Sequence, residues 1–128
     1  MIKVTTDEAT RILTIEMQGM VSEADMESAM DSLQERYPQV GVRLSGGTGG
    51  GIRVLHDWRH LEGWELGAKT FGTIMGKTLS DVIHRVAVVA DAKWHGEQDR
   101  LEDVAKRADV RFFTLDQHDM AMEWLQES

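Results

Sequence analysis

Gly76, Lys77 and Thr78 have the residue types that end a phosphate-binding P-loop. In that motif the lysine reaches the nucleotide phosphates, and another glycine stands five residues before the first of the three. Here that position holds Phe71, and the triplet lies inside a predicted helix instead of opening one. We therefore interpret the triplet as a chance match.

Histidines and carboxylates could bind a metal ion or transfer protons. His56 and His60 are four residues apart, but this spacing places two side chains on one face only in a helix, and His56 falls in a predicted strand. A carboxylate pair for acid–base chemistry stays open as an alternative, although helix caps and solvated charges explain these residues better. The sequence therefore predicts no metal, no cofactor and no enzyme. The side chains considered are His56, His60, His84, His95, His118, Asp57, Glu62, Glu65 and Asp91.

The composition is that of one folded domain with an acidic surface. Hydrophobic residues make up 41% of the 128 residues and charged residues 28%, which predicts a single domain over residues 1–128. The formal net charge is −8, from 22 acidic and 14 basic side chains. No nucleic-acid partner is expected, because a phosphate backbone requires a basic surface.

No segment has the features of a secretion signal or a membrane span. The longest apolar stretches fall well short of the roughly 18 residues that cross a bilayer. The chain has no cysteine, which excludes disulfides and thiol chemistry. The expected location is cytoplasmic, with peripheral membrane contact as an addition.

The N-terminal part of the chain predicts a hairpin and a helix. Residues 1–6 form one strand candidate, and residues 11–18 alternate apolar and polar side chains as a half-buried strand does. Gly19 is predicted to end the second strand. An N-cap at Ser22 begins the helix, and Pro38 stops it.

The remaining chain alternates strands and helices after a glycine-rich segment, which predicts a flexible loop at about residues 45–51. Strands are predicted over residues 52–57, 85–91 and 110–115, the second of them central because it is apolar on both faces. Asp116 is predicted to cap the last helix. This order predicts an α/β fold with a mixed, mostly parallel sheet, begun by an antiparallel hairpin and flanked by about four helices.

The helix predicted over residues 65–79 contains a row of small residues, Ala68, Gly72 and Gly76. Such a row allows close packing, while each interior glycine costs about 1 kcal/mol of helix stability relative to alanine. Two interpretations stay open: ordinary close packing, and a movable lid over an apolar cavity.

Three of the four tryptophans, Trp58, Trp64 and Trp94, are predicted at the carboxyl ends of two strands, where ligands bind in open α/β sheets. Phe71 and Met75 are predicted beside them. These side chains form either part of the core, the wall of an apolar pocket, or a surface that rests on a membrane or a partner.

Several segments together resemble the SpoIIAA-like family, a STAS-type group of small bacterial proteins. They are residues 57–68, 85–94, 110–113 and 121–125, and the run from Glu62 to Ala68 is the most specific. The resemblance implies a mixed sheet flanked by helices and a non-enzymatic module, related in shape to CRAL-TRIO-type lipid-carrying domains. It also implies an apolar pocket beneath mobile helices and peripheral membrane contact.

The chain departs from the anti-sigma-factor antagonists that give this family its name. Those proteins carry a phosphorylatable serine at the start of the helix after the corresponding strand. Residues 57–69 contain neither serine nor threonine, so a phosphorylation switch is not expected here.

The first expectation is therefore a binding module for a small apolar or lipid-like ligand, covered by the helix at residues 65–79, with the segment around residues 94–101 as a second candidate for the cover. Its expected contacts are Trp58, Trp64, Leu66, Phe71, Ile74, Met75 and Trp94. The alternative is a regulatory interaction module that binds a protein partner, or a second copy of itself as a homodimer, without using a cavity.

Overall fold

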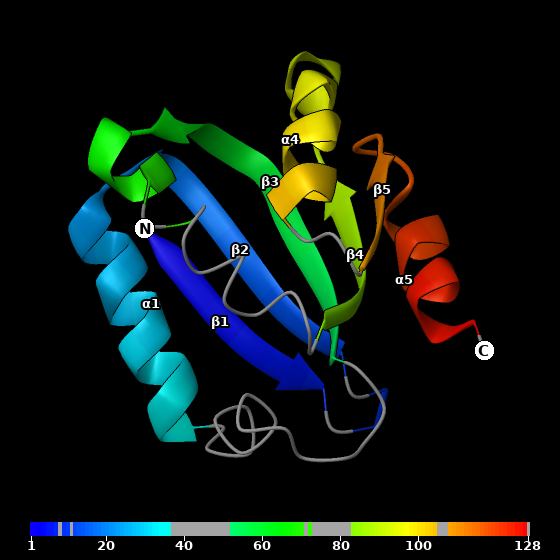
Figure 1. Ribbon diagram of the computed structural model, residues 1–128. Helices are drawn as coiled ribbons and strands as arrows, with labels where there is room; N and C mark the ends of the chain where they lie inside the picture. The colour runs from blue at the N-terminus through cyan, green and yellow to red at the C-terminus, as the bar shows by residue number, and fades with distance from the viewer. Residues whose placement is uncertain are drawn as a thin grey trace.

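The computed structural model describes residues 1–7, 9–10, 12–36, 52–70, 72, 83–104 and 108–127. Within them five strands form one sheet in the order β1-β2-β3-β4-β5 (Figure 1). β1 and β2 are antiparallel, and the other neighbours are parallel, which confirms the predicted α/β fold. The strands are β1 (Ile2–Asp7), β2 (Ile12–Val21), β3 (Ile52–Trp64), β4 (Ile83–Val89) and β5 (Asp109–Phe113). The described helices are α1 (Glu23–Arg36), a stretch over residues 66–70, the 3-10 helix η1 (Ala92–Glu97), α4 (Gln98–Val104) and α5 (His118–Gln126).

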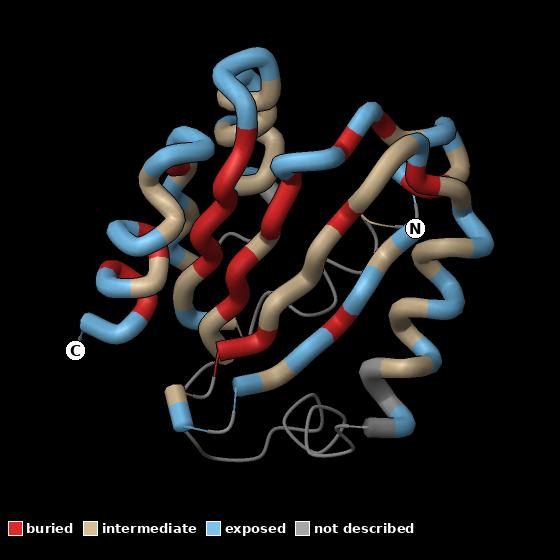
Figure 2. The backbone as a smooth tube through the Cα atoms, turned by 180° about the vertical axis from the view of Figure 1, so that it is seen from behind, coloured by how far each residue is buried: buried red, intermediate tan, exposed pale blue. Residues whose placement is uncertain are grey.

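Helices cover the two faces of the sheet unequally. α1, the stretch at residues 66–70 and α4 pack on one face, where Met26, Ala68 and Leu101 contact the larger hydrophobic cluster. α5 packs on the other face, where Trp124 belongs to the smaller cluster. Successive crossovers of one hand place their helices on one side of the sheet, which explains the crowded face. Figure 2 shows buried residues gathered in the central strands, whereas the edge strand β1 keeps much of its length exposed.

β4 lies in the middle of the covered part of the sheet. Residues 86–90 are all buried. Val86 and Val88 belong to the larger cluster, while Ala87 and Val89 belong to the smaller one. Successive side chains therefore alternate between two covered faces, and the prediction of a central strand is confirmed.

α1 begins with a reciprocal cap. The hydroxyl of Ser22 accepts a hydrogen bond from the backbone N–H of Asp25 (3.1 Å), and Asp25 Oδ2 accepts one from the backbone N–H of Ser22 (3.0 Å). The predicted N-cap is confirmed, because both backbone donors gain a side-chain acceptor. The predicted helix stop at Pro38 and the glycine-rich loop at 45–51 lie outside the described residues.

The C-terminal strand and helix differ from the prediction at their junction. β5 ends at Phe113 rather than at Leu115. Asp116 does not cap α5, since Gln117 holds the N-cap position and makes no side-chain cap hydrogen bond. The Asp116 carboxylate instead accepts a hydrogen bond from the hydroxyl of Thr114, which closes a local turn before the helix begins.

The largest departure from the prediction is β3, which continues to Trp64 instead of ending at Asp57. Its parallel register with β2 shows how. While β2 advances two residues, from Glu16 to Gln18, β3 advances three, from Asp57 to His60. This shift is a β-bulge, which is uncommon between parallel strands and reverses the facing of every later side chain.

A second bulge lies beside Gly19 of β2. Gly19 pairs with Leu61 and Met20 with Gly63, so β3 again advances one residue more than its partner. Gly19, predicted to end β2, lies inside the strand with a φ of 66°, and β2 continues to Val21. A positive φ suits glycine, which lets the strand follow its irregular neighbour without steric strain.

An ion pair between the buried carboxylate of Asp57 and the half-exposed guanidinium of Arg59 holds the first bulge. The side chain of Asp57, 5% exposed as a residue, accepts hydrogen bonds from the backbone N–H (3.1 Å), Nε (3.0 and 3.1 Å) and Nη2 (2.7 Å) of Arg59. Burial alone would raise the pKa of Asp57, but the hydrogen bonds and charge of Arg59 outweigh burial and lower it. The backbone N–H of Arg59, at the bulge, thereby has an acceptor.

We expect Arg59→Ala to lower the free energy of unfolding by about 2 kcal/mol at pH 7, because it leaves a buried carboxylate without its cation. With Arg59 present, the lowered pKa of Asp57 means that its contribution is complete at neutral pH and is lost only as the pH falls through that pKa. In the variant the side-chain hydrogen bonds and the charge of Arg59 are lost, so burial weighs more heavily and favours the protonated acid, and the deficit should shrink toward pH 4.

Urea denaturation at pH 7 and pH 4 measures both effects. Lys3→Ala, which removes an exposed cation from β1, is the control and should change stability little at either pH. An Arg59→Ala deficit of the same size at both pH values would contradict the assigned role of the pair.

Candidate ligand-binding cavity

The structure brings Trp58, Trp64 and Trp94 into one aromatic cluster. The ring centroids are 5.0 Å apart for Trp58 and Trp64, 5.3 Å for Trp64 and Trp94, and 6.5 Å for Trp58 and Trp94. Phe112 of β5 joins the cluster, with its centroid 5.7 Å from that of Trp58. All four contacts are edge-to-face, the arrangement that aromatic quadrupoles favour.

The bulges of β3 place its part of the cluster. Val54, His56 and Trp58 alternate along the regular part of the strand on the face that carries α1 and α4. After the first bulge Leu61 lies on that face, and after the second bulge Trp64 does so too. Each bulge reverses the side of the sheet to which the following β3 side chains point. Trp58, Leu61 and Trp64, which are three residues apart, therefore form a continuous apolar row on one face.

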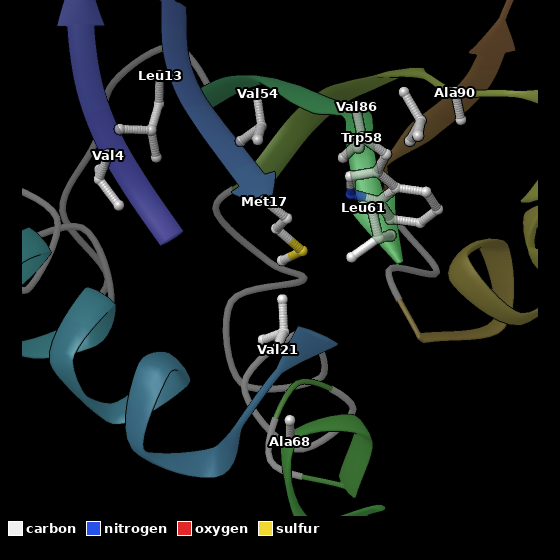
Figure 3. Packing of buried hydrophobic residues seen from close by; sticks show 11 residues of the cluster. Val4, Leu13, Met17, Val21, Val54, Trp58, Leu61, Ala68, Val86 and Ala90 are labelled. Atoms are coloured by element: carbon white, nitrogen blue, oxygen red, sulfur yellow. The ribbon is translucent and has the colours of Figure 1, made fainter. Parts of the chain in front are cut away.

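A cavity of about 130 Å³ lies between this face of the sheet and the helical layer. Met17, Trp58 and Val86 lie on the sheet side, with Ala68 of the helical stretch opposite them (Figure 3). Most of the lining is apolar, as in small-molecule sites generally. The described lining residues are Met17, Met26, His56, Trp58, Trp64, Ala68, Lys69, Gly72, Ile83, Val86, Arg100, Leu101 and Val110.

The residues predicted to contact a ligand fall into three groups. Trp58 and Trp64 line the cavity, whereas Trp94 packs on Trp64 without lining it. Leu66 is 83% exposed and does not reach the cavity, because it lies at the start of the helical stretch on its outer side. Phe71, Ile74 and Met75 lie outside the described residues.

The row of small residues packs closely where the structure describes it. Ala68 is fully buried. A Cβ added at Gly72 would lie 3.1 Å from Cε of Met26 in α1, closer than ordinary carbon contacts. This contact favours close packing of the row against α1 at Gly72, and the movable lid stays a prediction.

Two polar atoms of residues that line this cavity are buried without a hydrogen-bond partner among the described residues: Nδ1 of His56 and Nε1 of Trp58. Burial lowers the pKa of His56 to about 4, so its imidazole is neutral at pH 7. A buried polar atom without a partner costs about 1–3 kcal/mol.

Charged side chains gather at another part of the lining. Lys69 Nζ lies 3.6 Å from Glu97 Oε1, and Arg100 Nε donates to Glu97 Oε2 (2.5 Å). Burial would raise the pKa of Glu97, but Arg100 and then Lys69 outweigh burial and lower it. The guanidinium of Arg100 also lies 5.8 Å from the ring centroid of Trp64. Lys69 and Arg100 line the cavity, so it has a cationic border beside its apolar interior.

His56 was missed as a lining residue, although a signal for it was present. It alternates with Val54 and Trp58, so a period of two already places all three on one face. Lys69 and Arg100 gave no such signal, because their meeting depends on how two helices sit over the sheet.

Among the described residues, no group of three His, Asp or Glu side chains is close enough to hold a metal ion. None of the described helices is both long enough and apolar enough to cross a membrane.

The low pKa of His56 makes stability depend on pH. Between pH 6.5 and pH 4 the unfolded chain binds a proton at this position that the folded chain does not. The free energy of unfolding therefore decreases by up to about 3 kcal/mol as the pH is lowered through this range. His56→Gln should flatten this part of the curve, whereas His60→Gln, at an exposed position, should not. Urea denaturation between pH 4 and pH 7 measures the slopes, and equal slopes in the wild type and His56→Gln would contradict the burial of a neutral imidazole.

Comparisons with known proteins give a consistent fold. The family model described as SpoIIAA-like matches residues 12–126. One similar solved structure is that of an uncharacterized DUF3478-family protein with a SpoIIAA-like fold from Shewanella loihica PV-4, determined at 2.25 Å resolution. The two chains are 19% identical with a TM-score of 0.75, over 98% of this chain and 92% of that one. A comparison with curated proteins gave no match. With a family match over almost its entire length, the chain belongs to the SpoIIAA-like family.

Proposed function

We propose that this protein is a non-enzymatic binding module that holds a small, largely apolar ligand between its sheet and the helix beginning at residue 66. The observation that carries the proposal is the cavity itself, about 130 Å³ beside Trp58 and Trp64. Its described lining contains no hydroxyl or carboxylate side chain that could act with His56 as a nucleophile or proton partner. This composition supports retention of a ligand rather than chemistry on it.

The volume of the cavity limits the size of the ligand that it can hold. Pockets for drug-sized molecules have volumes of roughly 300–1,000 Å³, whereas an apolar cavity of about 150 Å³ accommodates benzene or xenon. At about 130 Å³, the cavity suits a single ring or a short aliphatic segment. A lipid-like ligand would therefore place only part of its apolar body among these described residues.

A titration with toluene tests the proposal. We expect saturable binding that changes tryptophan fluorescence, because Trp58 and Trp64 both line the cavity. Ala68→Leu should weaken toluene at least tenfold, since its larger side chain fills space at the cavity wall. Ala92→Leu introduces the same side chain at an exposed position and should bind as the wild type does.

Thermal unfolding of both variants separates loss of binding from loss of fold. If Ala68→Leu does not fold, Val110→Leu serves as the test variant instead, because it adds a smaller volume to the same cavity. No saturable signal in the folded wild type, confirmed by native mass spectrometry after gentle purification, would overturn the proposal.

A second candidate function is a regulatory module that docks a protein partner. Its support is an exposed apolar pair at one end of the sheet: Met20 is 54% exposed and Leu66 is 83% exposed. The pair lies where β2 and β3 end, since Val21 pairs with Trp64 and the helical stretch follows at residue 66.

We expect Leu66→Ser to abolish capture of one stoichiometric partner from a lysate without changing toluene binding, because Leu66 is exposed and does not line the cavity. Leu115→Ser, also at an exposed leucine but after β5, is the matched control. Vesicle sedimentation of the same two variants tests whether this end of the sheet binds a membrane. Light scattering tests whether it forms a homodimer. Capture that survives Leu66→Ser would count against docking at this end of the sheet.

A further inference from the structure

The two methionines of the cavity lining lie at the same end of the cavity. Met17 belongs to β2 and Met26 to α1, which packs beside β1. At the other end, Val110 of β5 and Leu101 of α4 line the cavity. Because β3 and β4 lie between β2 and β5, the lining crosses four neighbouring strands, and both methionines are at the side of α1.

Most of the other apolar lining side chains cannot move far. Ile83, Val86 and Val110 are branched at Cβ, which restricts rotation about χ1. Trp58 is 2% exposed and its indole contacts four other rings. Methionine differs from all of them, because its side chain is unbranched, has three rotatable bonds and adapts to irregular gaps.

Met26 has more freedom than Met17. Met17 is 6% exposed inside the larger hydrophobic cluster, whereas Met26 is half-buried at the edge of that cluster. A Cβ added at Gly72 would lie 3.1 Å from Cε of Met26, and both residues line the cavity. The methyl group of Met26 therefore closes the cavity between α1 and residue 72. Among the described apolar lining residues, Met26 is the one that is both unbranched at the side chain and half-buried on a helix next to solvent.

We infer that Met26 determines which ligands fit, and that the ligand carries an unbranched alkyl chain that takes the place of the Met26 side chain when this side chain turns outward. This inference rests on the proposed function, because it names the class of ligand for the same cavity. A compact ring or a body of similar size occupies the existing volume of about 130 Å³. The space that Met26 vacates has the width of one unbranched chain, because the methionine side chain is itself unbranched.

The chain must be apolar as well as narrow. The lining residues at this end, Met17 and Gly72, have no side-chain group that forms a strong hydrogen bond. A chain with hydroxyl or charged groups would lose their hydration there without gaining a partner. A branched group with the same number of carbon atoms would be wider than the vacated space, and the tightly packed contact at Gly72 limits how far that space can widen.

Three alkylbenzenes test this inference: toluene, n-butylbenzene and its branched isomer tert-butylbenzene. We expect n-butylbenzene to bind the wild type at least as tightly as toluene, because its chain replaces the apolar contacts of Met26, and at least tenfold more tightly than tert-butylbenzene. The two isomers have the same number of carbon atoms, so a difference between them reports the shape of the site rather than hydrophobicity in general. Titrations followed by tryptophan fluorescence measure the affinities.

Variants of two methionines on α1 assign the preference. Met26→Ala leaves the space permanently open and should reduce the preference for n-butylbenzene over tert-butylbenzene at least threefold. Met30→Ala is the matched control, because Met30 is also half-buried on α1 and packs on the same cluster but does not line the cavity. It should keep the preference of the wild type, and thermal unfolding verifies that both variants are folded.

Methyl resonances give a second measurement that needs no variant to fold. In wild-type protein labelled with ¹³C at the methionine methyl groups, n-butylbenzene should shift the resonance of Met26 more than toluene does. The resonance of Met30 should stay in place with either compound. If Met26→Ala does not fold, this comparison decides the role of Met26.

The outcomes separate this inference from the proposed function. Toluene binding together with weaker binding of n-butylbenzene shows a wall that does not yield, which overturns the inference and leaves the binding function intact. Equal effects of Met26→Ala and Met30→Ala on the preference also overturn it, as does equal binding of the two isomers by the wild type. Absence of binding by all three compounds removes the proposed function and the inference together.

Discussion

The structure depends on the way β3 changes its facing twice within its last eight residues. In a regular strand, side chains three apart point to opposite faces, so Trp58, Leu61 and Trp64 could not share one core. Two bulges against β2 remove this conflict, and the side chain of Asp57, bonded to Arg59, supplies an acceptor at the first. The aromatic cluster and the cavity follow from that local irregularity.

The two faces of the sheet then take different roles. On one face, α5 closes a compact core in which residues as large as Trp124 are buried. On the other, α1, the stretch at residues 66–70 and α4 pack on a cluster that contains the indoles, which contact one another edge to face. The cavity lies beside these rings. Space for a guest therefore lies on this face, where the structure describes it.

Much of the fold could be predicted from the sequence because its periodicities are strong. Alternation along residues 12–17, the doubly apolar β4 and the cap at Ser22 each depend on local chemistry that survives in the folded chain. The extension of β3 could not be predicted in this way. Its apolar residues recur every three positions, which breaks the period of a strand, and only pairing with β2 reveals the bulges. The site was predicted in part: the tryptophans do meet, but a cavity is what packing leaves unfilled, and no local pattern encodes it.

The proposed binding function requires that the space beside Trp58 persists in the folded protein and accepts an apolar guest. A crystal structure determined under xenon pressure tests it most directly, because xenon enters apolar cavities of this size without requiring polar contacts. We expect a xenon atom among Met17, Trp58, Ala68 and Val86, with the surrounding side chains in place. Side chains collapsed into that space, with no xenon bound there, would contradict it.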